Sequence, residues 1–448
     1  MALKSKPEIV LSKTYRKVIA DKPRQIAFEV FTEVMRNGAY SNLLLPQRLV
    51  KSDLERRDRA FITELVYGSI RQIGRNDFIA SKFSNKPWSE VDAGIVDVIR
   101  MGAYQLFDMR IPTHAAVDAT TNIARAVLGE SKATFVNAVM RKMSAASLDQ
   151  HLIDVQGDDV SSLSIRYSHP EWIINSYRDF ISDLNELKEL LNSNNTPAKP
   201  TLVSWPSKST QEELISEGAV ATKFSKFGAS YDGNPLDIKA VAEKRAGVQD
   251  EGSQILAQIF AQAAKAKEPW LDLCAGPGGK AALLSYLAAG DFYANEINAS
   301  RAKLVSDVVA AKTKINVGDG REIDLEVNAI LADVPCTGLG ALRRRPEVRW
   351  RRTPADLPAL SKLQFELAAH AIEILPSGGI FGYATCSPHV AETSAQCATF
   401  EKKFEIDKID VTPFMPEGLN GGVRNGYMQL WPHRHETDAM FLALYRKR

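Results

Sequence analysis

Residues 268–287 read EPWLDLCAGPGGKAALLSYL, and this stretch decides the fold of the C-terminal half of the chain. An apolar run, a glycine-rich turn and an apolar run with helical spacing follow one another, which predicts a strand, a turn and a helix. Strands and helices continue to alternate beyond it, with further strands predicted in DFYANEI, KINVGDG, NAILADVP and GIFGYATC. This alternation predicts a doubly wound parallel sheet with helices on both faces, in which ligands bind at the carboxyl edge of the strands.

The glycine turn predicts a nucleoside site. Gly276, Gly278 and Gly279 leave no Cβ between the backbone and a ligand, and the helix that follows directs its free N–H groups to the same place. The spacing differs from GxGxxG and from GxxxxGK[ST], which disfavours NAD and ATP. Glu296 ends the second strand and is placed to accept hydrogen bonds from ribose hydroxyls, and Asp319 ends the third and is placed to accept one from an adenine amine.

The fourth and fifth strands end in ADVPCTGLG and ATCSP, so neighbouring strand ends carry Asp333 with Cys336 and, beside them, Cys386. The other cysteines are Cys274 and Cys397, and the four positions match no zinc spacing and no dense disulfide framework. We therefore expect reduced thiols and no metal. A thiolate at a strand end is suited to attack a ligand, but cysteine is also commonly a small buried hydrophobe, and Cys386 alone does not decide between the two.

The chain has 448 residues, too many for one ordinary core, and three zones follow an initial basic, flexible terminus at 1–22. Residues 23–147 repeat apolar positions three and four apart, as in RAFITELVYGSIRQI, which predicts an all-helical domain. Residues 148–246 begin with helical patterns and turn strand-like in KPTLVSW, which predicts a small α+β connecting module. Residues 247–448 form the predicted α/β domain, and its end, NGYMQLWPHRHETDAMFLALYRKR, predicts two strands around a loop.

Composition places the chain among ordinary soluble proteins, with 45% hydrophobic and 25% charged residues. No apolar run approaches the roughly 18 residues of a membrane span, and the opening MALKSKPEIV lacks the apolar core of a signal peptide. We expect a cytoplasmic protein with no membrane partner.

The net charge of +2 is too small to argue for nucleic acid by itself, but the basic residues are clustered. Residues 343–352 read RRRPEVRWRR, with six arginines and one glutamate. A solvated charge run is one interpretation. The other is RNA binding, with arginines on phosphates and an aromatic ring on an unstacked base; the residues concerned are Arg343, Arg344, Arg345 and Trp350.

Three motifs in order, GPGGK, DVPCTG and ATCS, resemble those of the RNA 5-methylcytosine methyltransferases of the ribosomal RNA small-subunit methyltransferase B type. Positions 275–276 read AG where many relatives have AA or AP, which leaves the glycine turn intact. The stretches RDRAFITELVYGSIR and PTHAAVDATTNIAR resemble the NusB family of transcription antitermination factors, a helical RNA-binding fold. The resemblance implies a NusB-like domain joined through a small module to a Rossmann-like, S-adenosylmethionine-dependent methyltransferase domain that acts on small-subunit (16S) ribosomal RNA.

The resemblance also implies the roles of individual residues. Cys386 would add to carbon 6 of cytosine as the nucleophile, Asp333 would bind the base edge and hold or share a proton, and Cys336 would assist release. DNA cytosine methyltransferases use the Pro-Cys cysteine as nucleophile, and spacing alone does not choose between the two. The implied cofactor site comprises Cys274, Ala275, Gly276, Pro277, Gly278, Gly279, Lys280, Glu296, Arg301, Asp319 and Asp333.

Two alternatives stay open at this point. The first keeps the chemistry but moves it to transfer RNA, because the catalytic motifs do not distinguish the two substrates. The second is a non-catalytic RNA-binding or antitermination protein; loss of Cys386 or of the glycine turn would have favoured it, and both are present. The sequence leaves the target cytosine and the oligomeric state open, with a monomer expected.

Overall fold

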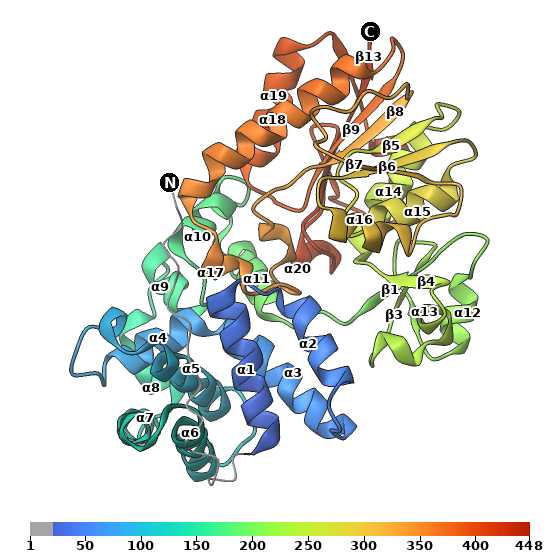
Figure 1. The fold of residues 1–448 in the computed structure, drawn as a ribbon. Helices are drawn as coiled ribbons and strands as arrows, with labels where there is room; N and C mark the ends of the chain where they lie inside the picture. Colours follow the sequence, from blue (N-terminus) through green and yellow to red (C-terminus); the bar gives the residue numbers. More distant parts are fainter. Residues whose placement is uncertain (1–20) are drawn as a thin grey trace. The chain divides into compact units, whose positions relative to one another are not determined.

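The computed structural model describes residues 21–448, which form two compact units (Figure 1). One unit holds the described residues up to Asn175 together with Arg344–Arg351. The other holds Ser176–Arg343 and Arg352–Arg448. The basic terminus predicted at 1–22 lies almost entirely outside the described residues. The predicted connecting module is divided between the units, with its first helices in one and its sheet in the other.

The first unit is helical, as the sequence predicts. Each helix presents one apolar stripe, except α5, which is buried on most sides and lies at the centre of the unit. The side chain of Asp92 caps α5 by accepting hydrogen bonds from Gly94 N at 3.0 Å and Ile95 N at 3.3 Å. The helices are α1 (Lys22–Asn37), α2 (Ser41–Val50), α3 (Arg56–Arg71), α4 (Ile73–Ser81), α5 (Ala93–Phe107), α6 (Thr113–Leu128), α7 (Glu130–Met143), α8 (Leu148–His151) and α9 (Val160–Arg166).

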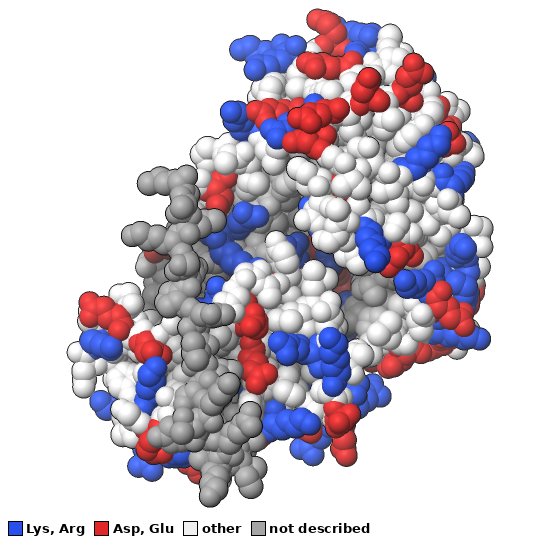
Figure 2. All heavy atoms as spheres, in the orientation of Figure 1, with Lys and Arg blue, Asp and Glu red and all other residues white. Residues whose placement is uncertain are grey.

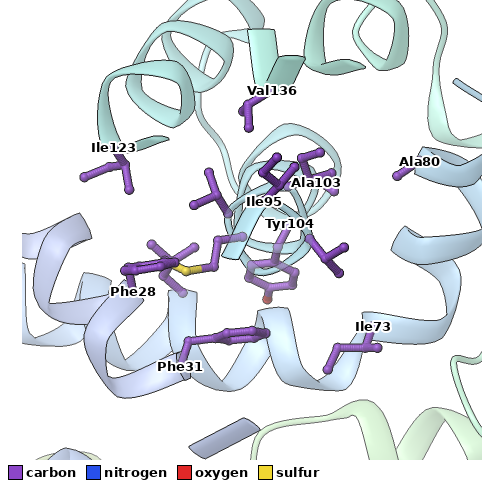
Figure 3. Packing of buried hydrophobic residues seen from close by; sticks show 14 of the residues in the cluster. Phe28, Phe31, Ile73, Ala80, Ile95, Ala103, Tyr104, Ile123 and Val136 are labelled. Atoms are coloured by element: carbon purple, nitrogen blue, oxygen red, sulfur yellow. The ribbon is translucent and has the colours of Figure 1, made fainter. Parts of the chain in front are cut away.

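The core of this unit forms around α5 (Figure 3). Phe28 and Phe31 of α1 lie beside Tyr104 of α5, and all three are buried. Helix α3 approaches closely because position 68 is glycine: a Cβ there would lie 1.9 Å from the Tyr104 ring. The close packing of these helices therefore depends on one small residue.

A segment from the C-terminal half completes the helical unit. Arg344–Arg351, which ends in the short helix α17 (Val348–Arg351), belongs to this unit by its contacts. Glu347 is fully buried and accepts hydrogen bonds from Ser41 N at 3.1 Å and Ser41 Oγ at 2.7 Å. The indole N–H of Trp350 donates to Ile70 O at 2.7 Å. Much of the arginine-rich run is thus a structural part of the helical unit.

The second unit begins with helical and mixed structure. Helix α10 (Glu171–Arg178) crosses the boundary of the two units, and α11 (Leu184–Asn195) follows. A four-stranded antiparallel sheet of order β2-β3-β1-β4 comes next, with two short helices between its strands. Its elements are β1 (Thr201–Ser204), α12 (Gln211–Ser216), β2 (Val220–Ala221), β3 (Gly228–Ser230), α13 (Lys239–Ala242) and β4 (Ala246–Val248).

A nine-stranded sheet dominates the second unit, and its strand order is β11-β12-β13-β9-β8-β5-β6-β7, with β10 paired to β13. The five strands predicted from the sequence are parallel neighbours, and a C-terminal hairpin adds antiparallel strands. The strands are β5 (Trp270–Asp272), β6 (Phe292–Glu296), β7 (Lys314–Val317), β8 (Ala329–Asp333), β9 (Ile380–Thr385), β10 (Ile406–Ile409), β11 (Val423–Arg424), β12 (Tyr427–Gln429) and β13 (Phe441–Lys447).

Helices cover both faces of this sheet. Successive residues of the buried strand β8 enter different cores: Leu331 packs with α14 and α15, whereas Ile330 packs with α18 and α19. Alternate side chains of a strand point to opposite faces, so the continuous apolar run NAILAD serves both layers. The helices are α14 (Glu251–Ala263), α15 (Gly279–Leu287), α16 (Ala299–Ser306), α18 (Leu357–Ile374), α19 (Ser394–Lys403) and α20 (Pro432–His435).

Charges of both signs are mixed over the surface of the described residues. Lysine and arginine side chains lie next to aspartate and glutamate on the face seen in Figure 2. Within residues 21–448, no helix is both long enough and apolar enough to cross a bilayer.

Candidate active site

The two cysteines at the fourth and fifth strand ends meet at one edge of the sheet. Strands β8 and β9 are parallel neighbours with Asp333 opposite Ala384, and Val334 N donates to Ala384 O at 3.0 Å. The loops beyond the strands stay in register, because Gly340 N donates to Cys386 O at 2.9 Å. The Sγ atoms of Cys336 and Cys386 are 3.4 Å apart. Two thiols separated by 50 residues in the chain therefore form one site.

Among the four described cysteines, Cys336 and Cys386 are the pair whose sulfur atoms are in contact. Cys336 and Cys386 are half-buried, and all four cysteines of the described chain are free thiols. The hydrogen bond to Cys386, together with burial, raises the pKa of the Cys336 thiol well above its ordinary value. Cys336 therefore keeps its proton at neutral pH. Cys274 packs against the sheet core, where burial raises its pKa, and Cys397 is fully buried in α19.

Charged side chains lie beside the thiols on the neighbouring strands. Lys280, in the first turn of α15, donates from Nζ to Asp333 Oδ2 at 2.6 Å. Burial alone would lower the pKa of Lys280, but its pairing with Asp333 raises it above the ordinary value, so the ammonium stays charged. The sequence does not predict this pair, because its pattern assigns Lys280 to the cofactor.

Asp272, which ends β5, is a site residue that the sequence analysis missed. It is 1% exposed; its Oδ1 accepts from Cys274 N at 3.3 Å, and its Oδ2 has no hydrogen-bond partner among residues 21–448. Burial, followed by the charge of Asp333, raises the pKa of Asp272 to about 7. The signal was visible in WLDLCAG, where a carboxylate interrupts an apolar strand directly before the glycine turn. Such perturbed groups in a site are typical of functional residues.

The glycine turn links β5 to the start of α15. Gly278 has φ +113°, a left-handed conformation that favours glycine. Gly276 N donates to Glu296 Oε2 at 3.1 Å, and a Cβ on Gly276 would lie 2.1 Å from that oxygen. Gly279 is exposed, and a Cβ there would only touch the Gln249 side chain, at 3.9 Å. The turn therefore provides a stretch of backbone with a carboxylate at its side.

Arginines contact both predicted nucleoside-binding acids. Arg301 donates to Glu296 Oε1 at 2.5 Å, and Arg321 donates to Asp319 Oδ2 at 2.6 Å. The hydrogen bonds from Arg321 hold the pKa of Asp319 below its ordinary value. Both acids lie at the ends of neighbouring parallel strands, with Glu296 opposite Val317 in the register of β6 and β7. The predicted cofactor residues thus lie along one sheet edge, with Ala275 buried and Pro277 exposed in the turn.

The predicted RNA-binding residues are not gathered in this site. Arg343 belongs to the second unit, whereas Arg344, Arg345 and Trp350 belong to the helical unit. The Trp350 ring packs against the helical core, and the Arg345 guanidinium lies 4.8 Å from the Tyr40 ring centroid. Arg349, for which no role was predicted, is fully buried and donates to Ser168 O at 3.0 Å.

Comparison with known proteins agrees with this architecture. The family model described as 16S rRNA methyltransferase RsmB/F matches residues 259–446, and the model of the NusB family matches residues 21–145. A Mycobacterium tuberculosis protein that carries a methyltransferase name is 38% identical over 443 residues, covering 95% of this chain and 97% of that protein. The ribosomal RNA small subunit methyltransferase B of Proteus mirabilis is 27% identical over 446 residues, covering 95% and 98%.

Solved structures share the fold. The crystal structure of PH0851 superimposes with a TM-score of 0.78 at 21% identity and covers 96% of this chain and 100% of that one. NSun6 from Pyrococcus horikoshii gives a TM-score of 0.54 at 16% identity, covering 62% of this chain and 98% of that one.

The fold and site thus define a doubly wound methyltransferase. The chain belongs to the RsmB/F methyltransferase family and carries a NusB-family domain in its N-terminal part. The family and the fold class predicted from the sequence are confirmed.

Proposed function

We propose that the chain transfers a methyl group from S-adenosylmethionine to carbon 5 of a cytosine in RNA, through a covalent bond between Cys386 and the base. The observation that carries this proposal is the pair of thiols 3.4 Å apart at the sheet edge, with the Lys280–Asp333 pair at the end of the neighbouring strand. Cytosine carbon 5 is a poor nucleophile, and a thiol at carbon 6 is the group that activates it.

The residues around the glycine turn fit S-adenosylmethionine. Gly279 is exposed, and the Oδ2 of Asp272, which has no hydrogen-bond partner within residues 21–448, provides an acceptor for a cationic amine. Glu296 would bind the ribose hydroxyls, and Asp319 the adenine amine, each at the end of its strand. When bound, this cofactor supplies an electrophilic methyl group on a sulfonium. The chain's part is to orient it at the edge where Cys386 lies.

Cys386 is the proposed nucleophile. Its thiolate adds to carbon 6 of the cytosine, and the electron pair of the C5–C6 bond moves toward carbon 5, which becomes an enamine carbon able to accept the methyl group. The Cys336 sulfur lies 3.4 Å from the Cys386 sulfur, so either thiol can donate a hydrogen bond to the other. The choice of Cys386 rather than Cys336 as the nucleophile rests on the resemblance of its ATCS motif to the RNA methyltransferases.

Asp333 and Cys336 have the remaining proposed roles. Asp333, oriented by Lys280, would accept a hydrogen bond from the exocyclic amine and share a proton with ring nitrogen 3, where negative charge develops as the thiolate adds. After methyl transfer, a base must take the proton from carbon 5; the electron pair of the C5–H bond then re-forms the C5–C6 double bond, and the Cys386 sulfur departs as thiolate. Cys336 lies within contact of that sulfur and would assist this release.

The proposed substrate is small-subunit ribosomal RNA. Its support is the name of the Proteus mirabilis relative, which the chain matches over nearly its full length, and the NusB-family domain. Transfer RNA is the alternative substrate, since the catalytic residues do not distinguish the two. A non-catalytic role is disfavoured, because the glycine turn and both motif cysteines are present and assembled.

Bisulfite mapping of total RNA tests the proposal. RNA from cells lacking the protein, treated with purified protein and S-adenosylmethionine, should gain a bisulfite-resistant cytosine in small-subunit ribosomal RNA. A gain only in transfer RNA would change the substrate but keep the chemistry. No gained cytosine in any RNA, with an enzyme that binds the cofactor, would overturn the proposed activity.

A further inference from the structure

A buried carboxylate lies behind the two thiols, and neither the sequence motifs nor the proposed mechanism uses it. Glu392 follows β9 at the end of a short 3-10 helix, Val390–Glu392, and is fully buried. Its Oε1 accepts from Thr337 N at 2.8 Å and from Gln364 Nε2 at 3.0 Å, and its Oε2 accepts from Thr337 Oγ1 at 2.5 Å. All three donors are neutral groups.

These contacts join the two cysteine loops. Thr337 directly follows Cys336, and its Oγ1 lies 3.0 Å from the Oγ of Ser387, which directly follows Cys386. One carboxylate therefore fixes the residue after one thiol, and through a hydroxyl it contacts the residue after the other. The set Thr337, Gln364, Tyr383, Ser387 and Glu392 is called the Glu392 cluster here.

The rest of the Glu392 cluster fixes Glu392 itself. Gln364 of α18 also donates to Pro335 O at 2.9 Å, so it holds the residue before Cys336 as well as the Glu392 carboxylate. Tyr383 of β9 donates from its hydroxyl to Glu392 O at 2.9 Å. The backbone of Glu392 is thus bonded to a strand of the sheet domain, and its carboxylate to a helix.

We propose that Glu392 is the positioning residue of the two thiols: it sets the distance and orientation of Cys336 relative to Cys386 for the methyl-transfer reaction. This inference rests on the proposed function for its role in catalysis. The geometric part, that Glu392 fixes the approach of the two sulfurs, stands independently of the substrate.

A carboxylate at this place does more than an apolar side chain would. A buried anion is costly unless it is well hydrogen-bonded, so its presence with neutral donors argues for a specific use. The hydrogen bond to Cys386 and burial are the largest causes of the raised pKa of Cys336, and the Glu392 carboxylate adds to them. Glu392 therefore positions the Cys336 loop and contributes to the raised pKa of its thiol.

Two variants separate geometry from charge. Glu392→Ala removes the acceptor for the Thr337 amide and hydroxyl and should release the Cys336 loop. Glu392→Gln keeps an oxygen for the Thr337 amide but loses the charge. Glu401→Gln is the control for the loss of a hydrogen-bonded carboxylate: this exposed carboxylate of the next helix also accepts from neutral hydroxyls, those of Tyr427 at 2.6 Å and Tyr445 at 3.1 Å, and it is not part of the Glu392 cluster.

The first readout needs neither RNA nor cofactor. Diamide oxidises two adjacent thiols to a disulfide while its N=N bond takes up both hydrogens, and the rate of Cys336–Cys386 formation reports how the sulfurs approach. Peptide mapping of the full chain should show rapid formation in the wild type and the control, and at least tenfold slower formation in Glu392→Ala. In a Cys386→Ser background, Glu392→Gln should shift alkylation of Cys336 by iodoacetamide to lower pH.

The second readout is steady-state methylation. Misplacement of a catalytic group by about 1 Å costs roughly 100-fold, so kcat should fall on that order in Glu392→Ala while the KM for S-adenosylmethionine stays within twofold. Glu392→Gln should recover most of the disulfide rate and only part of kcat. A purely structural role would lower the melting temperature and leave kcat of the folded enzyme unchanged.

The outcomes are distinct for the two proposals. A wild type that methylates no cytosine refutes the proposed function, and the disulfide rate still tests Glu392. A methylating wild type whose Glu392→Ala variant keeps both the disulfide rate and kcat overturns the positioning role. Where Glu392→Ala does not fold, Glu392→Gln alone decides: an unshifted Cys336 alkylation profile with unchanged kcat refutes the inference.

Discussion

Replacing Asp272 by asparagine should make the chain more stable at alkaline pH and abolish part of its pH dependence. The folded structure raises the pKa of this buried carboxyl from its ordinary 3.8 to about 7. A shift of one pKa unit corresponds to about 1.36 kcal/mol, so ionising Asp272 costs the folded state roughly 4 kcal/mol once it is complete. A group whose folded pKa is raised contributes stability below its unfolded pKa and loses it as the pH rises through the folded pKa.

Most of this loss of unfolding free energy falls within a pH range in which unfolding can be measured. Between pH 5 and pH 8, the linkage relation gives a loss of about 2.6 kcal/mol in the wild type, and Asp272→Asn should not show it. The advantage of the variant over the wild type should therefore grow by about 2–3 kcal/mol over this range. Urea unfolding of the full chain at each pH measures it, with tryptophan fluorescence as the reporter; one of the six tryptophans, the buried Trp270, lies in the same strand as Asp272.

Asp319→Asn is the control for this experiment. The pKa of Asp319 is lowered by its hydrogen bonds from Arg321, so its contribution is present above its unfolded pKa and is lost only on acidification. Its stability difference from the wild type should stay flat between pH 5 and pH 8. Parallel pH profiles of Asp272→Asn and the wild type would refute the reasoning, because they would show that Asp272 is ionised in the folded state at no cost.

Three further predictions concern other parts of the chain. Trp350→Ala should lower the free energy of unfolding of the helical unit by about 2–4 kcal/mol, which is less than the loss of a fully buried ring. Trp350→Phe should lose mainly the hydrogen bond to Ile70 O, about 1 kcal/mol. Urea unfolding measures both variants, and equal effects within error would contradict the packing of the Trp350 ring. Gly276→Ala should weaken S-adenosylmethionine binding at least tenfold, because the new Cβ would lie 2.1 Å from Glu296 Oε2 and displace that carboxylate. Calorimetry measures the affinity, and an unchanged affinity would show that Glu296 is not part of the cofactor site. Arg343→Ala with Arg344→Ala should flatten the log–log salt dependence of RNA binding by about 1–2 units, and an unaltered slope would show that these arginines do not contact RNA phosphates.

Much of the sheet domain can be predicted from the sequence because its signals are local. Apolar runs bounded by turn residues locate β5, β6, β7, β8 and β9. The rule that parallel strands end at one edge then places Cys336, Cys386 and Asp333 together, as the pairing of β8 with β9 confirms. The antiparallel hairpin near the C-terminus is also predicted, from two strand patterns around a loop.

Other features depend on contacts between distant residues, which no local pattern encodes. The indole of Trp350 contacts Ile70, 280 positions away. The sequence therefore predicted RRRPEVRWRR to be a surface stripe, although Glu347 and Arg349 are buried. Lys280 was predicted to bind the cofactor because its actual partner, Asp333, lies 53 positions further along the chain. Glu392 gave no signal, since its partner Thr337 is on another loop.

The central claim is that Cys386 forms the bond to cytosine and Cys336 helps to break it, and trapping of RNA by the two cysteine variants tests this most directly. In the presence of S-adenosylmethionine, Cys336→Ser should methylate but release slowly, and a protein–RNA complex should survive denaturing electrophoresis. Cys386→Ser should give neither methylation nor a covalent complex. A complex that accumulates in Cys386→Ser instead would show that the roles are reversed, and undiminished methylation in both variants would contradict thiol catalysis altogether.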